Sequence, residues 1–130
     1  MNQTRYERGW QKLQEIDGAA GQRVMDGLKD IAPDLSRYMT EFPFGDVYSR
    51  SNLDLKSRAI ATIAALTALG NAQPELKAHI HSALNVGCTR EEVVETILQM
   101  AVHAGFPATL SGMAAAKDVF RERDADGYLT

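Results

Sequence analysis

Residues 55–69 read LKSRAIATIAALTAL and contain the longest mostly apolar run of the chain. From Ala59 onward every residue in it is apolar except two threonines, and it contains neither glycine nor proline. A helix that is apolar nearly all round is normally buried, so we expect this helix to be central. Asp54 is placed to cap its start, and Gly70 follows as a stop signal.

Helical patterns continue on both sides of this stretch. No run of alternating β-branched residues appears, so no sheet is predicted. Besides 55–69, the expected helices cover residues 4–16, 21–31, 34–42, 74–86, 90–104 and 107–123, with an ordered connector at 43–51 and a frayed polar tail at 124–130. Thr89 and Glu92 form a capping-box pattern at one helix start. The sequence therefore predicts a single all-α domain over residues 1–130, a compact bundle of about six helices.

Composition excludes several classes of protein. The chain of 130 residues carries 17 acidic and 14 basic residues, a formal charge of −3, which argues against a nucleic-acid binder. Its longest mostly apolar run, residues 59–69, is too short to span a membrane, and no signal peptide is recognised, so we expect a cytoplasmic protein. With Cys88 as the one cysteine, no intramolecular disulfide is expected.

Five motifs carry a family resemblance through their order and spacing. They are FGDVYSR at 44–50, KSRAIATIA at 56–64, ELKAHI at 75–80, NVGCTREEV at 85–93 and AGFPA at 104–108. Together they resemble the γ-carboxymuconolactone decarboxylases over about residues 43–118. The resemblance implies the fold of alkylhydroperoxidase D-type proteins and homo-oligomeric assembly, as a trimer or hexamer. It also implies a small-molecule substrate, and we expect no metal or organic cofactor.

Glu75 and His79 are the predicted catalytic residues. They lie four residues apart, so their side chains are neighbours on one helix face. A carboxylate beside an imidazole fixes its tautomer and suits it to proton transfer near neutral pH. From their spacing alone, Glu75 and His79 are more typical of an ordinary surface pair than of a catalytic pair. The resemblance, however, implies that they lie where the reactive residues of the superfamily are found. A third metal ligand beside them is not identifiable, so no metal site is predicted.

Four further residues are predicted to bind substrate. A carboxymuconolactone-like substrate bears two carboxylates, and arginine binds a carboxylate through two parallel hydrogen bonds. We predict that Arg50 and Arg58 hold these groups, with Asp46 and Tyr48 beside them. Asp46 would orient an arginine or contact substrate through water. The alternative for Asp46 and Arg50 is a local salt bridge that anchors the loop.

Two histidines and the cysteine have reactive side chains but are not among the predicted site residues. His81 points to the other side of its helix from His79, which favours a surface or interface position. His103 lies near a helix C-terminus, where a cation is favourable, and lining the same pocket is a second reading. Cys88 is expected to be a small apolar turn residue, with a reactive thiol as the alternative.

The expected function is a cofactor-free decarboxylase acting on a small acidic lactone such as 4-carboxymuconolactone, in aromatic-compound catabolism. One alternative is an alkylhydroperoxidase-type redox protein, but Ala72 and Glu75 occupy the two cysteine positions of that motif. Another is a small-molecule-binding oligomer that has lost the chemistry. Three apolar residues that look exposed would suit subunit contacts in either case: Trp10, Phe42 and Phe44.

Overall fold

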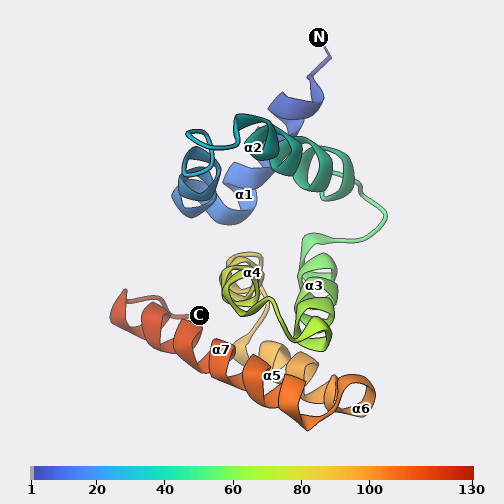
Figure 1. The fold of residues 1–130 in the computed structure, drawn as a ribbon, viewed down its shortest axis with the longest axis vertical. Helices are drawn as coiled ribbons and strands as arrows, with labels where there is room; N and C mark the ends of the chain where they lie inside the picture. The colour runs from blue at the N-terminus through green and yellow to red at the C-terminus, as the bar shows by residue number, and fades with distance from the viewer. Residues whose placement is uncertain (1) are drawn as a thin grey trace. The chain divides into compact units, whose positions relative to one another are not determined.

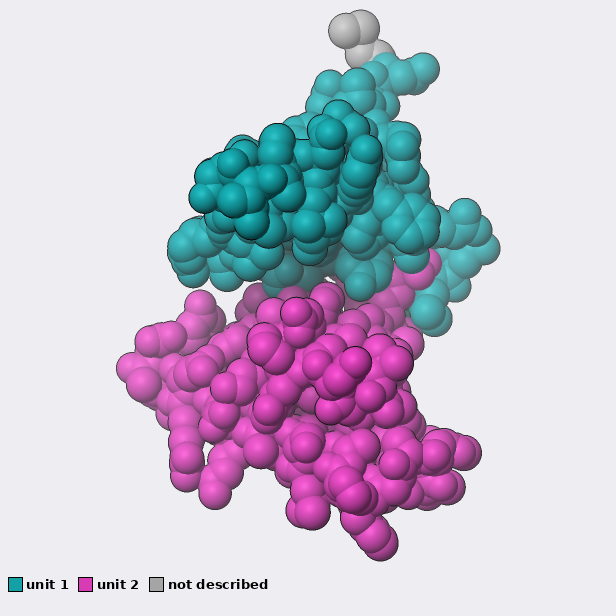
Figure 2. Space-filling view, in the orientation of Figure 1, with its two compact units in different colours: residues 1–54 teal, residues 55–130 magenta. Residues whose placement is uncertain are grey.

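The computed structural model describes residues 2–130 (Figure 1). Over these residues it contains seven α-helices, one π-helix and no strand, which confirms the predicted all-α fold. The helices pack as two compact units (Figure 2). The first unit ends at Asp54, and the second runs from Leu55 to Thr130. That the whole chain forms one domain stays a prediction.

The first unit consists of α1 (Arg5–Asp26), α2 (Pro33–Met39) and the π-helix η1 (Thr40–Val47). Thr4 caps α1, its hydroxyl accepting a hydrogen bond from the Glu7 backbone N–H at 3.0 Å. Gly18 kinks α1 with φ 54°, at the place where the sequence predicted one helix to end. The next predicted helix, 21–31, was too long, because α1 ends at Asp26 and turns follow.

The prediction of an ordered connector over residues 43–51 was wrong for residues 43–47, which belong to η1. The backbone N–H of Tyr48 donates to the carbonyl of Pro43, five residues earlier, at 2.7 Å. In an α-helix a proline lacks the donor for one hydrogen bond, and its ring clashes with the carbonyl four residues before it. The wider π-turn is a conformation in which Pro43 stays inside a helix.

Two glycines let α1 and η1 pack with their backbones in contact. A Cβ atom on Gly45 would lie 2.6 Å from the carbonyl oxygen of Arg5, well inside van der Waals distance. A Cβ atom on Gly9 would collide with the carbonyl oxygen of Thr40. Any larger residue at either position would push the helices apart, so the glycines set this packing. No local pattern in the sequence predicts this role for Gly9 or Gly45.

The second unit consists of α3 (Leu55–Leu69), α4 (Gln73–Asn85), α5 (Arg90–Gln99), α6 (Ala101–Ala104) and α7 (Phe106–Ala125). The predicted helices 55–69, 74–86 and 107–123 are confirmed to within two residues. The predicted helix 90–104 is interrupted at Met100 and continues as the short α6. The capping box is confirmed: Thr89 Oγ1 accepts from the Glu92 N–H, and Glu92 Oε1 accepts from the Thr89 N–H.

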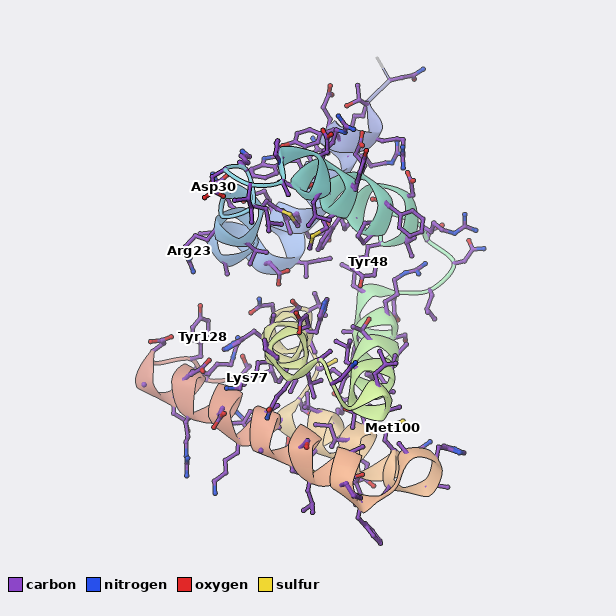
Figure 3. All side chains as sticks on the ribbon, viewed as in Figure 1. Arg23, Asp30, Tyr48, Lys77, Met100 and Tyr128 are labelled. Atoms are coloured by element: carbon purple, nitrogen blue, oxygen red, sulfur yellow. The ribbon has the colours of Figure 1, made fainter. Side chains whose placement is uncertain are left out.

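The core of the second unit lies between α3, α4, α5 and α7. Each helix contributes one large, completely buried side chain: Ile63, Ile80, Ile97 and Val119. Lys77 of α4, labelled in Figure 3, pairs with Asp118 of α7 at 2.8 Å and ties these two helices at their edge. The predicted buried stripe of α4 is confirmed, since Leu76, Ile80 and Leu84 all lie in the core.

The expectation that α3 is central is met on one of its faces only. Ile63 and Thr67 are buried, and α3 packs against α4, α5 and α7. Its other face leaves four apolar residues exposed: Ala61, Ala65, Ala68 and Leu69. Within residues 2–130, no helix combines the length and the apolar character needed to cross a membrane.

Candidate functional site

Glu75 and His79 lie on α4 at the edge of its buried stripe. Pro74 lies in the first turn of the helix, where a proline costs no helical hydrogen bond. Glu75 is exposed in this first turn, and His79 follows one turn later, half-buried. Leu76 and Ile80, the residues after each of them, are in the core. A half-buried imidazole beside apolar side chains and one turn from a carboxylate is a suitable proton donor.

Arg58 belongs to the neighbouring helix of the same unit. It is half-buried near the start of α3, and its backbone carbonyl accepts a hydrogen bond from Thr62 Oγ1 at 2.9 Å. Because α3 packs directly against α4, two adjacent helices carry Arg58, Glu75 and His79. The structure thus places three of the six predicted site residues in the second unit.

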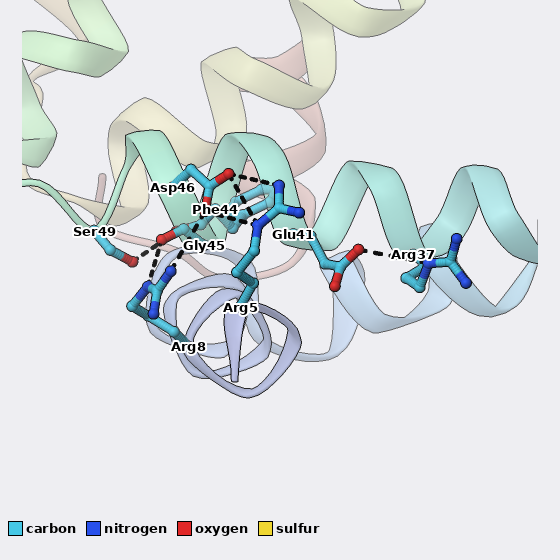
Figure 4. Close-up of polar contacts among 8 residues, drawn as sticks. All are labelled: Arg5, Arg8, Arg37, Glu41, Phe44, Gly45, Asp46 and Ser49. Atoms are coloured by element: carbon cyan, nitrogen blue, oxygen red, sulfur yellow. Dashed lines mark hydrogen bonds and ion pairs between the residues drawn. The ribbon is translucent and has the colours of Figure 1, made fainter. Parts of the chain in front are cut away.

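Asp46 holds α1 and η1 together (Figure 4). Its carboxylate accepts hydrogen bonds from Arg5 Nε at 3.1 Å and Nη2 at 2.6 Å, and Arg8 Nη2 lies 3.4 Å away. The Arg5 guanidinium keeps the pKa of the Asp46 carboxyl below its usual range. Arg8 also donates from Nε to the carbonyl of Gly45 at 2.7 Å. The two arginines that contact Asp46 come from α1, and neither is a predicted substrate-binding arginine.

Tyr48 and Arg50 follow Asp46 in the first unit. The Tyr48 ring meets the Phe44 ring edge-on, with centroids 5.2 Å apart and planes at 87°. Phe44 is only 8% exposed, so the expectation that it is a surface residue was wrong, whereas Phe42 is exposed and Trp10 half-buried. Arg50 is exposed, and its backbone N–H donates to the Val47 carbonyl at 3.1 Å. Substrate binding by Asp46, Tyr48 and Arg50 stays a prediction.

His103 lies elsewhere in the second unit. It is exposed on α6 and lines an open groove with Glu95, Leu98, Val102 and Phe106. Neither Glu75 nor His79 lines this groove. The position at a helix C-terminus, the first reading of His103, agrees with the structure.

Cys88 is a buried turn residue, as the sequence predicted. It is 2% exposed, and its Sγ lies 3.8 Å from the backbone carbonyl of Lys56. Lys56 in turn pairs with Glu92 of the capping box at 2.9 Å, so this turn is tied to the start of α3. Over residues 2–130, no three side chains of histidine, cysteine, aspartate or glutamate are grouped so as to hold a metal ion.

A family model described as the Carboxymuconolactone decarboxylase family matches residues 33–118. The match covers more than half of the chain and includes all six predicted site residues. The chain belongs to this family. The model ends at the same residue as the resemblance drawn from the motifs, and it begins ten residues earlier, at Pro33 rather than Pro43.

Relatives of this family agree with that assignment. The chain is 34% identical to a 4-carboxymuconolactone decarboxylase of Acinetobacter baylyi over 122 residues, 93% of this chain and 90% of that protein. It is 35% identical to an uncharacterized 15.0 kDa protein of Paracoccus denitrificans over 78% of this chain and 77% of that one. A nitrosuccinic acid decarboxylase of Metarhizium robertsii is 31% identical over 65% of this chain and 58% of its own length.

Proposed function

We propose that the protein is a cofactor-free carboxy-lyase that removes carbon dioxide from a small acidic lactone, 4-carboxymuconolactone or a close analogue. The observation that carries the proposal is the similarity over 93% of the chain to a protein named for that reaction. A second relative named as a decarboxylase of a different small acid supports the class of reaction. The half-buried His79 on α4 supplies a proton donor for it.

Decarboxylation here needs an electron sink and a proton. The bond between the lactone carbon and its carboxylate breaks, carbon dioxide leaves, and the bonding electron pair enters the unsaturated lactone. His79, positioned by Glu75, then gives its proton to the resulting dienolate, and solvent reprotonates the imidazole. Removing such a general acid typically lowers the rate by about 10²–10⁴-fold.

Arg58 is the proposed ligand for a substrate carboxylate. Its guanidinium supplies a planar pair of donors, and its helix packs against the helix of His79. We also propose, from the sequence alone, that Arg50 binds a carboxylate, with Asp46 and Tyr48 beside it.

Apolar side chains of α3 would favour loss of the carboxylate. Ala59 and Ile60 are partly buried and pack on the core of the second unit beside Arg58. Loss of hydration against such a surface raises the free energy of a charged carboxylate, whereas it has little effect on uncharged carbon dioxide. We propose that this contact lowers the barrier to breaking the C–C bond.

The redox alternative is disfavoured by the cysteine content. Disulfide-based peroxide reduction in a single chain requires two cysteines, and this chain has one. That cysteine, Cys88, is 2% exposed, which is a poor position for a peroxide-reactive thiol.

The proposal includes assembly of several copies of this chain, as a trimer or hexamer, in the cytoplasm. Four large apolar side chains at the α5–α7 end of the second unit are exposed: Leu98, Val102, Phe106 and Leu110. A cluster of this kind is typical of subunit contacts. Light scattering on the purified protein tests the assembly, and a monomer at micromolar concentration would contradict it.

The function is tested by comparing substrates. Purified protein is incubated with 4-carboxymuconolactone and, separately, with nitrosuccinate, and loss of each substrate is followed. We expect turnover of the lactone and little of nitrosuccinate. Turnover of nitrosuccinate alone would support the carboxy-lyase class but contradict the lactone as substrate. Turnover of neither by a folded oligomer would contradict the proposed function.

A further inference from the structure

Thr67 of α3 carries a buried hydroxyl that the proposed reaction does not use. Its side chain is 1% exposed, and its Oγ1 atom has no hydrogen-bond partner among residues 2–130. A buried hydroxyl without a partner has lost its hydrogen bonds to solvent and gained none in return, which costs free energy. Buried polar atoms in folded proteins nearly always have a protein or water partner, so Thr67 Oγ1 indicates a bound molecule.

The other threonines inside helices all use their hydroxyls within their own helix. Each donates to the backbone carbonyl four residues earlier, at 2.8–3.1 Å: Thr40, Thr62, Thr96 and Thr109. This is the hydrogen bond that a helical threonine ordinarily makes. Thr67 does not make it, so its hydroxyl is left for a partner outside α3.

Gly112 of α7 faces this hydroxyl. A Cβ atom on Gly112 would lie 3.4 Å from Thr67 Oγ1, 3.1 Å from Thr67 Cγ2 and 2.8 Å from Ile97 Cγ2. Glycine is less favourable than alanine inside a helix, so its presence here follows from the lack of room for a side chain. With glycine at this position, α7 approaches α3 closely and the space beside Oγ1 is not filled by a methyl group.

A small pocket lies beside these two residues. Thr67 and Gly112 line it together with the apolar side chains of Leu66, Leu76 and Ala108. Its volume is about 10 Å³, and a single water molecule needs about 10–15 Å³. An organic ligand does not fit in this space, so the geometry restricts the ligand to one molecule of the size of water.

The pocket also lies where two helix ends supply polar groups. Thr67 belongs to the last turn of α3, where backbone carbonyls lack helical partners, and Gln73 begins α4, where backbone N–H groups lack them. Ala72, the N-cap residue of α4, has no polar side chain that could cap these groups. Gln73 and Ser111 line the pocket too, and Gln73 Nε2 donates to the Ser111 carbonyl at 3.3 Å. A buried water makes two to four hydrogen bonds, and these groups are suitable partners.

We propose that this pocket binds one water molecule, which hydrogen-bonds to Thr67 Oγ1 and joins the end of α3 to the start of α4. We call it the Thr67 water site. Arg58 lies on α3, and Glu75 and His79 lie on α4, so the water helps to hold together the two helices that carry these residues. The inference does not rest on the proposed function, because it is drawn from the hydroxyl and the pocket alone, and either can fail without the other.

The test counts long-lived internal waters in the full-length protein by ¹⁷O magnetic relaxation dispersion. The signal comes from the water oxygen, so proton exchange of the threonine hydroxyl does not contribute to it. Thr67→Val removes the hydroxyl, keeps the shape of the side chain and should lower the number of long-lived waters by one per chain. Thr109→Val is the matched control, because Thr109 is also a buried helical threonine but donates to the Gly105 carbonyl at 3.1 Å. It should leave the number unchanged.

Thr67→Ser keeps the hydroxyl and should retain the water. The same number of long-lived waters in wild type and in folded Thr67→Val would overturn the proposal. Loss of a water in Thr109→Val but not in Thr67→Val would overturn it too.

Urea unfolding of Thr67→Val is an independent measurement. If the hydroxyl is hydrogen-bonded to a water, its removal should raise the equilibrium constant of unfolding by about two- to tenfold. A buried hydroxyl without any partner is itself unfavourable, so replacing it by a methyl group would then lower that constant. A lower unfolding constant in Thr67→Val than in wild type would therefore overturn the proposal.

Discussion

Arg5 and Asp46 lie 41 positions apart in the chain and form a forked ion pair, with Arg5 Nε 3.1 Å from each carboxylate oxygen and Nη2 2.6 Å from Oδ2. Arg8 of the same helix reaches the same carboxylate at 3.4 Å. The pair joins α1 to the end of η1. Asp46, which the sequence suggested as a substrate contact, therefore has a structural role in the first unit.

Replacing Asp46 by asparagine should lower stability in a pH-dependent manner. The pKa of Asp46 is lowered in the folded protein by Arg5, so its contribution is complete above the unfolded value, about 4, and is lost as pH falls through the folded value. In urea unfolding, the free energy of unfolding should therefore be higher for wild type than for Asp46→Asn at pH 7 and nearly equal for the two proteins near pH 2. Asp30→Asn, in an exposed turn, is the control. A difference in free energy of unfolding between wild type and Asp46→Asn that is the same at both pH values would contradict the role of the ion pair.

Adding a methyl group at Gly45 should destabilise the first unit. The new Cβ would lie 2.6 Å from the Arg5 carbonyl, which cannot move without shifting α1. Overpacking of this kind costs about 1–3 kcal/mol. Gly27→Ala, where the backbone is helical at φ −64° and the new atom would lie 3.2 Å from the Arg23 carbonyl oxygen, should destabilise the protein less than Gly45→Ala. Chemical denaturation measures both, and a Gly45→Ala protein as stable as wild type would show that the helices separate easily.

Cys88 should be inert in the native protein. Its side chain is 2% exposed, so a thiol reagent reaches it only after local or global unfolding. The rate of modification by Ellman's reagent should rise with urea along the unfolding curve. Cys88→Ser should keep its lactone turnover and show no change in peroxide consumption. Fast labelling without denaturant, or peroxide turnover that depends on Cys88, would revive the redox alternative.

Arg58→Gln should raise KM by a larger factor than it lowers kcat. Loss of a charge-assisted hydrogen bond costs about 1.5–3 kcal/mol, which corresponds to a KM higher by about 10–100-fold. Steady-state kinetics with 4-carboxymuconolactone measure the change, with Arg121→Gln as the matched control on an exposed arginine. A KM equal to that of wild type would remove Arg58 from the carboxylate site.

The second unit was largely predictable from the sequence, because its signals are local. The glycine after α3, Pro74 at the start of α4 and the Thr89 capping box each define a helix end by backbone chemistry within a few residues. The buried stripe of α4 followed from helical spacing alone. The same reasoning overstated α3, since periodicity cannot tell a buried alanine from an exposed one.

The first unit was predicted less well because its determinants are long-range. The contact of Gly9 with Thr40 and that of Gly45 with Arg5 depend on two segments meeting, and neither local sequence indicates the other. The π-helix around Pro43 was missed because a proline followed two residues later by a glycine is typical of a loop. The partners of Asp46 were missed for the same reason as the glycine contacts.

The most direct test of the central claim is release of labelled carbon dioxide from carboxyl-¹³C 4-carboxymuconolactone by wild type, His79→Gln and His103→Gln. His103 is an exposed histidine in the same unit and serves as the matched control. We predict one carbon dioxide per lactone consumed by wild type and His103→Gln, and a rate lower by about 10²–10⁴-fold in His79→Gln. Equal release by all three proteins would contradict the role of His79, and no release by any of them would contradict the carboxy-lyase itself.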